Sequence, residues 1–132
     1  MTGVKNLSEL IKNMTPELND GIYVFATVKN INTIERSKAI CEFKEKEGTT
    51  VIVDQEYADK LGLAYNYTAA WITLKIHSSL DAVGLTAAFS NKLAESNISC
   101  NVVAGYYHDH IFVEKKDAKK AIAALKKFSI EK

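Results

Sequence analysis

Hydrophobic residues recur along this chain with two spacings, one typical of helices and one typical of strands. Near the start, the apolar positions of 7–14 follow the i, i+3, i+4, i+7 rule that places side chains on one helix face. Asn6 and Glu9 form a capping-box pattern at its beginning, and Pro16 disfavours helix in the residue before it. The pattern predicts a helix over 7–14, followed by a tight turn over 15–21.

The middle of the chain is rich in β-branched and aromatic residues, which is typical of strands. Strands are predicted over 21–28, 39–45 and 49–53, the last two as a hairpin. The polar loop between the first two strands is too short for a full crossover helix. A short helix is predicted next, with Asp54 as its N-cap and Gly62 at its C-terminal end.

In the second half, strand and helix patterns alternate. Residues 71–76 alternate with a period of two, which is the period of a strand. A helix is predicted to about residue 95, with Ser79 or Asp81 as its cap and Gly84 in its first turn. The remaining elements are predicted as a strand over 99–107, a turn at His108-Asp109, a strand over 110–115 and a lysine-rich helix over 115–128.

Composition restricts the class of protein. The chain has 132 residues, 47% hydrophobic and 25% charged, which suits one soluble domain or two very small ones sharing a core. Its net charge of +1 argues against a nucleic-acid binder and gives no reason to expect a membrane surface as partner. Cys41 and Cys100 favour reduced core thiols in a cytoplasmic protein. No signal peptide and no membrane-spanning stretch is predicted.

The order of predicted elements is similar over residues 21–70 and 71–132, and both resemble a split βαβ, ferredoxin-like unit. The first copy departs from that unit because its first crossover helix is missing. The helix over 7–14 is expected to cover the sheet face left open there. The predicted fold class is therefore α+β, with two related halves.

Three segments carry a family likeness: WITLKIHSSLDAVGLTAAFS, LAESNISCNVVAGYYHDHIFV and NLSELIKNMTPELNDGIYVF. Together they resemble the ACT-domain family, and in particular small stand-alone bacterial proteins with two aspartokinase-type ACT-like halves. The resemblance implies a ferredoxin-like βαββαβ fold with two tandem subdomains. The first, at 1–70, is the atypical one, and 71–132 is the regular ACT domain.

The resemblance also implies a function. ACT domains pair side by side and bind small effectors, often amino acids, at the interface between two domains. This implies a non-catalytic regulatory protein, a homodimer, an amino acid as ligand and no cofactor. The binding elements of the family, transferred to matching positions here, are His77, Ser78, Ser79, Leu80, Asp81, Ala82, Val83, Gly84, Leu85, Thr86, Asn101, Val102, Val103 and Ala104.

The residues around Gly84 support this expectation physically. A helix N-terminus presents unpaired N–H groups and a partial positive charge, so it can receive a carboxylate. Glycine lacks a Cβ and allows either a ligand or a neighbouring backbone to come close. Ser78 and Ser79 can donate to a ligand or cap the helix.

The run from Tyr106 to His110 has three interpretations. His108 and His110 can share a metal with Asp109, although a third strong ligand is missing. They can act with His77 as acid and base. They can also be structural, with Asp109 in the turn and the tyrosines and histidines packed at an interface. A small histidine-dependent enzyme or metal-binding protein, and a structural module without ligand, therefore remain alternatives to the amino-acid sensor.

Overall fold

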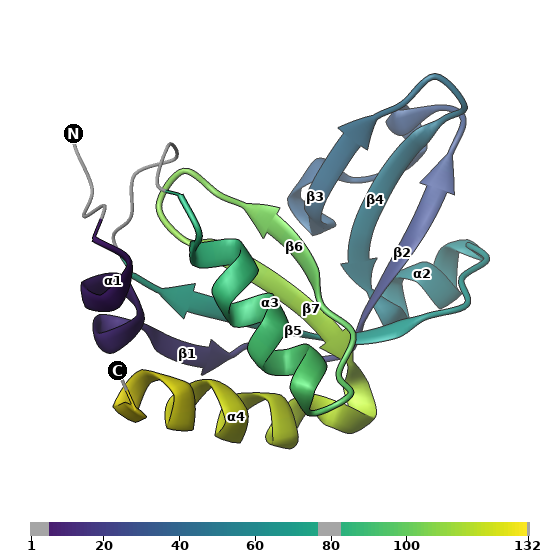
Figure 1. Cartoon of the computed structure of the whole chain (residues 1–132). Coiled ribbons are helices and arrows are strands. Elements are labelled where there is room, and N and C mark those ends of the chain that lie inside the picture. Colours follow the sequence, from purple (N-terminus) through teal and green to yellow (C-terminus); the bar gives the residue numbers. More distant parts are fainter. Residues whose placement is uncertain (1–5, 77–82, 132) are drawn as a thin grey trace. The chain divides into compact units, whose positions relative to one another are not determined.

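The chain begins in one folded unit, passes through a second and returns to the first (Figure 1). The structure is a computed structural model that describes residues 6–76 and 83–131. Unit 1 consists of the described residues of Met1–Asp20 and Ala70–Lys132, and unit 2 of Gly21–Ala69. The chain returns from unit 2 to unit 1 between Ala69 and Ala70. The first 20 residues were predicted to lie with 21–70, whereas their described part, from Asn6, lies in unit 1.

Unit 2 is a small antiparallel sheet with helices on one face. Its strands are ordered β3-β4-β2-β5. Only the first two residues of β5 (Thr68–Lys75) pair with β2. Ala58 of the helix packs with Ile34 and strand residues such as Val24 and Val51. The elements are β2 (Tyr23–Val28), η1 (Ile31–Thr33), η2 (Arg36–Lys38), β3 (Ala39–Lys44), β4 (Thr49–Asp54) and α2 (Gln55–Leu61).

Two predictions for unit 2 are confirmed. The β3–β4 hairpin forms, and the loop after β2 holds only two short 3-10 turns in place of a crossover helix. The predicted caps of α2 are also present. The Asp54 carboxylate accepts from the Glu56 N–H at 2.8 Å, and Gly62 ends the helix in the left-handed region.

Unit 1 has strands in the order β1-β5-β7-β6. Counted from β5, this is the order 4-1-3-2 of a ferredoxin-like sheet, and the same order holds in unit 2 counted from β2. The elements are α1 (Leu7–Asn13), β1 (Thr15–Leu18), β5 (Thr68–Lys75), α3 (Leu85–Glu95), β6 (Asn101–Ala104), β7 (Asp109–Glu114), η3 (Lys115–Asp117) and α4 (Ala118–Glu131).

The fourth strand of unit 1 comes from the N-terminal segment, where a tight turn was predicted. That prediction is wrong for residues 15–18, because β1 pairs antiparallel with β5 from Thr15↔Lys75 to Leu18↔Ile72. Pro16 fits because β1 lies at the edge of the sheet, where one backbone N–H is dispensable. The Glu17 carboxylate also pairs with the Lys75 ammonium at 3.1 Å.

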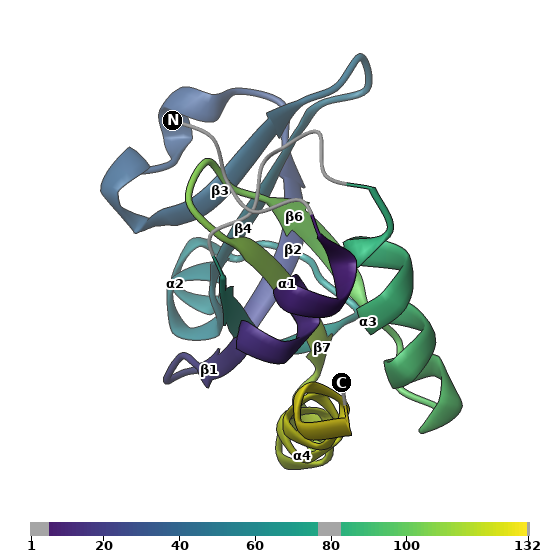
Figure 2. The same ribbon diagram turned by 60° about the vertical axis from the view of Figure 1, so that its left-hand side comes forward.

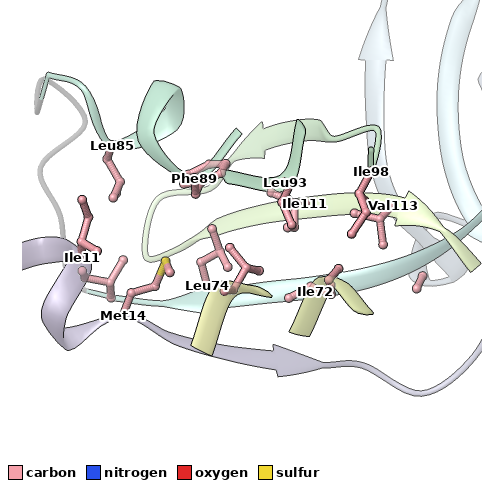
Figure 3. Close-up of a cluster of buried hydrophobic side chains, with 14 of the residues drawn as sticks. Ile11, Met14, Ile72, Leu74, Leu85, Phe89, Leu93, Ile98, Ile111 and Val113 are labelled. Carbon is pink, nitrogen blue, oxygen red and sulfur yellow. The ribbon is translucent and has the colours of Figure 1, made fainter. Parts of the chain in front are cut away.

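The core of unit 1 lies between one sheet face and the three helices α1, α3 and α4. Figure 3 shows side chains of α3 and of α1 directed towards those of β5 and β7. In Figure 2, α4 is seen nearly along its axis and packs against both α1 and α3. The fully buried members include Ile72, Leu74, Phe89, Leu93, Ile111 and Leu125.

Helix α1 was expected to cover the sheet of unit 2, and this is wrong. Leu10 and Ile11 are 1% and 2% exposed within the core of unit 1. The Ser129 hydroxyl of α4 donates to the Lys12 carbonyl at 2.9 Å. Because β1 follows α1 after one residue, the pairing of β1 with β5 carries α1 onto the same unit.

Gly84 lies just before α3 and not in its first turn. It is the N-cap residue, with φ of +95°, a conformation that L side chains rarely adopt. A Cβ at this position would lie 3.3 Å from Leu7 Cδ2 of α1. Backbone conformation and close approach of α1 therefore both favour glycine here.

Among the described residues, no helix combines the length and the apolar character needed to cross a membrane.

Replacing Ile11 with alanine should lower the free energy of unfolding of unit 1 by about 2–5 kcal/mol, because a fully packed aliphatic side chain is lost. Leu7→Ala is the matched control, since Leu7 is 37% exposed and should cost far less. Urea unfolding followed by fluorescence of Trp71, the single tryptophan, reports on unit 1 alone. Equal midpoints for the two variants would contradict the placement of α1 in this core.

Gly84→Ala should destabilise the protein by about 1–2 kcal/mol, because alanine pays the steric cost of a positive φ. Part of this loss, on the order of 0.5 kcal/mol, should disappear in a Leu7→Ala background, where the Cβ has room. A double-mutant cycle measured by urea unfolding separates the two causes. Strict additivity would show that Leu7 does not restrict residue 84.

Candidate functional site

Residues His77 to Ala82 of the predicted site, which include Ser78, Ser79, Leu80 and Asp81, lie outside the described residues. The described part begins with Val83, which is 84% exposed. Leu85 is buried, and Figure 3 shows its side chain directed into the core. Thr86 is exposed. In the described part, 83–86, a ligand can contact Val83, Thr86 and the backbone of Gly84. It cannot contact the buried Leu85 side chain.

The N-terminus of α3 has the chemistry expected of an anion site. Gly84 provides no side-chain cap to the first turn, and its carbonyl accepts from the Ala88 N–H at 2.9 Å. The N–H groups of the first turn point out of the helix and carry its partial positive charge. Among the described residues, a carboxylate placed there would meet donors without displacing a capping side chain.

The second predicted segment, Asn101 to Ala104, forms β6 at the edge of the unit 1 sheet. Asn101 and Ala104 are exposed, whereas Val102 and Val103 are half-buried, and Val102 packs against the core. An edge strand presents unpaired backbone groups on one side. Within unit 1, β6 is therefore available for pairing with another chain.

The predicted turn at His108-Asp109 is displaced by two residues. Tyr106 and Tyr107 occupy the turn, 72% and 66% exposed, and the Gly105 N–H donates to the His108 carbonyl at 2.9 Å. Their rings meet edge to face with centroids 5.0 Å apart. A Cβ at Gly105 would lie 2.8 Å from the His108 carbonyl oxygen, so glycine is needed where the hairpin closes.

His108 and His110 take part in different contacts. His108 Nδ1 lies 3.5 Å from the Ile76 carbonyl oxygen, at the end of β5. His110 lies on β7, and its Nδ1 accepts a hydrogen bond from the Trp71 indole N–H at 3.0 Å. Among the described residues, no group of three or more His, Cys, Asp or Glu side chains is arranged to hold a metal ion.

Burial shifts the titration of this cluster. It raises the pKa of the Asp109 carboxyl, an effect opposed by the nearby His110 and His108. It lowers the pKa of His110, and the charge of His108 lowers it further, while Asp109 opposes both. Burial also raises the pKa of the Cys41 and Cys100 thiols, so both remain protonated near neutral pH. Neither thiol forms a disulfide.

A polar network around His110 was not predicted from the sequence. Thr73, 7% exposed, has its hydroxyl 3.2 Å from His110 Nδ1 and 3.0 Å from the Asn19 amide nitrogen. Asn19 also donates twice to the Trp71 carbonyl, through its backbone N–H at 2.9 Å and its side chain at 3.2 Å. The alternation of 71–76 places Trp71 and Thr73 on one face, but nothing in the sequence links Asn19 to them.

A shallow pocket of about 370 Å³ lies at the opposite end of α3. Its polar lining includes Asn97, Ser99, Glu114, Lys116 and Asp117. Lys116 is paired with Glu114 at 3.4 Å, and its side chain is 77% exposed. This pocket could not be predicted from the sequence, because its residues come from two segments, 94–99 and 114–117, with ordinary polar composition.

Comparison with solved structures places the chain beside a protein of known fold and unknown function. A Vibrio cholerae protein, described as of unknown function and a possible transport protein, is 48% identical, with a TM-score of 0.85. The match covers 97% of this chain and 99% of that one. No curated protein matches the chain.

More distant matches share the fold alone. The regulatory subunit of aspartate kinase from Thermus thermophilus is 8% identical, with a TM-score of 0.54 over 85% of this chain and 95% of that one. A putative C-terminal regulatory domain of aspartate kinase from Porphyromonas gingivalis is 18% identical, with a TM-score of 0.54 over 85% and 94%.

Two family models complete the comparison, both described as ACT domain. One matches residues 2–70 and the other residues 66–127. The α+β fold with two tandem ACT-like halves, expected from the sequence, is thus confirmed. With these matches over nearly its full length, the chain belongs to the ACT-domain family.

Proposed function

We propose that this protein is a non-catalytic regulatory module that binds an amino acid at the N-terminus of α3. ACT domains usually bind small-molecule regulators such as amino acids. The observation that carries the proposal is the start of α3, where the N-cap residue Gly84 has no side chain that could accept from the first-turn N–H groups. Two unpaired cysteines support the cytoplasm as its proposed location.

The proposed site has two parts. Residues 77–86, of which the structure describes 83–86, receive the ligand carboxylate at the start of α3. Asn101 to Ala104 of a second copy, facing that segment, supply the remaining contacts. The exposure of Asn101 and Ala104 on an edge strand supports this arrangement, and it makes the homodimer part of the proposed site.

The electrostatic part of the proposal predicts opposite effects of one substitution on stability and binding. Thr86→Asp adds a negative charge to the first turn of α3, which should leave stability unchanged or raise it by about 0.3–1 kcal/mol through the helix dipole. The same charge should repel a ligand carboxylate and weaken binding at least tenfold. Thr86→Asn is the neutral, similarly sized control and should bind normally.

The measurement is a thermal-shift screen of amino acids at millimolar concentration, followed by calorimetry on those that stabilise the protein. A ligand at 100 times its Kd stabilises the folded state by about 2.7 kcal/mol, a shift of several degrees. If no amino acid shifts the wild type, the ligand class is wrong. If Lys116→Gln abolishes binding and Thr86→Asp does not, the ligand occupies the other end of α3 and the site is wrong.

The dimer can be tested separately. Light scattering should give twice the chain mass of 14.6 kDa for the wild type. Ala104→Lys places a charge on the edge strand β6 and should shift the protein towards monomer. Ala123→Lys, on an exposed position of α4, is the control and should remain dimeric. A monomeric wild type would remove the second copy from the proposed site.

A further inference from the structure

The indole N–H of Trp71 fixes the protonation of His110. Indole nitrogen is a donor only, so the His110 Nδ1 atom that faces it at 3.0 Å must carry a lone pair. His110 is therefore neutral in this structure, with its proton on Nε2. If Nδ1 were protonated, two N–H donors would face each other.

The bond lies in a network that joins three parts of unit 1. Thr73 and Trp71 belong to β5, His110 belongs to β7, and Asn19 follows β1. Asn19 and Trp71 are also next to the two places where the chain leaves and re-enters this unit, after Asp20 and before Ala70. The three hydrogen bonds of Asn19 thus hold the outgoing and the returning segments together.

We propose that His110 is a proton-sensitive contact between β7 and β5: its protonation breaks the hydrogen bond that its Nδ1 accepts from the Trp71 indole N–H. The Thr73 hydroxyl can reverse and accept from a protonated Nδ1, because its oxygen lies 3.2 Å away. It then stops donating to His110, and the Trp71 N–H loses this acceptor. The rearrangement is therefore centred on the Trp71 indole, while the Thr73 oxygen can still accept from the Asn19 amide.

The charges around His110 set the pH at which this occurs. His108 and Asp109 precede it along the chain. From β5 and β1, the pair Lys75–Glu17 flanks Thr73 on the same face. From β6, the residue opposite is the uncharged Val103. Burial and His108 lower the pKa of His110 below its ordinary value, and Asp109 opposes them.

The sign of the stability effect follows from this pKa direction. An unfolded histidine binds its proton near pH ~6.5. The folded form binds it at lower pH, so the unfolded chain takes up the proton first as the pH falls. The contribution of His110 to stability is therefore complete above pH ~6.5 and is lost as the pH falls towards the lower folded-state pKa.

Trp71 fluorescence between pH 8 and pH 4.5 tests the proposal. We expect one reversible change in fluorescence, with a midpoint below the ordinary pKa of histidine. His108→Asn should move the midpoint up and Asp109→Asn should move it down, because each removes one opposing charge. These opposite shifts would identify His110 as the group whose titration the fluorescence reports.

His110→Asn is the decisive variant, because its amide oxygen can accept near the Nδ1 position without titrating. Its fluorescence should not change with pH over this range, whereas the fluorescence of the wild type should. A transition that survives in His110→Asn, or no transition in the wild type, would overturn the proposal. Should His110→Asn fail to fold, nitrogen NMR of wild-type His110 decides: a proton on Nδ1 at pH 7.5 would also overturn it.

Discussion

The pairing of β1 with β5 is the interaction on which unit 1 depends. A ferredoxin-like sheet needs a strand beside its first one, and the four residues from Thr15 to Leu18 supply it. The register then fixes what lies before and after β1. Before it, α1 is carried onto the core, and Leu7 reaches Gly84. After it, Asn19 reaches the Trp71 carbonyl. Both the candidate site and the His110 network therefore depend on one edge strand.

Most elements could be predicted because their local patterns agree with their final environment. Residues 71–76 alternate in the sequence, and the predicted apolar face of Ile72, Leu74 and Ile76 is the one that lies in the core of unit 1. Asp54 caps α2, as the sequence predicts. In such segments, local preference and tertiary packing favour the same structure.

Other features could not be predicted because they depend on contacts distant in sequence. Thr15 to Leu18 contains a proline and a charge, so it looks like a turn until β5 lies beside it. The β6–β7 turn was misplaced because His108-Asp109 has a common turn composition, whereas Gly105 is required by the His108 carbonyl. For the candidate site, the sequence identified Gly84 but not why glycine is needed there. The structure shows two causes, the positive φ of residue 84 and the nearby Leu7 side chain.

The two ends of α3 offer different electrostatics to a small molecule. At the C-terminal end, the shallow pocket carries Lys116 together with Glu114 and Asp117. The Lys116 side chain is largely exposed, and its ammonium is already paired with Glu114. Water and salt therefore screen the attraction of this ammonium for a carboxylate. At the N-terminal end, the donors are backbone N–H groups, which are held in place by the helix and need no side chain to be ordered. The proposed function therefore places a ligand carboxylate at the Gly84 end, although a pocket of about 370 Å³ lies at the Lys116 end. That proposal rests on fixed backbone dipoles and not on pocket volume.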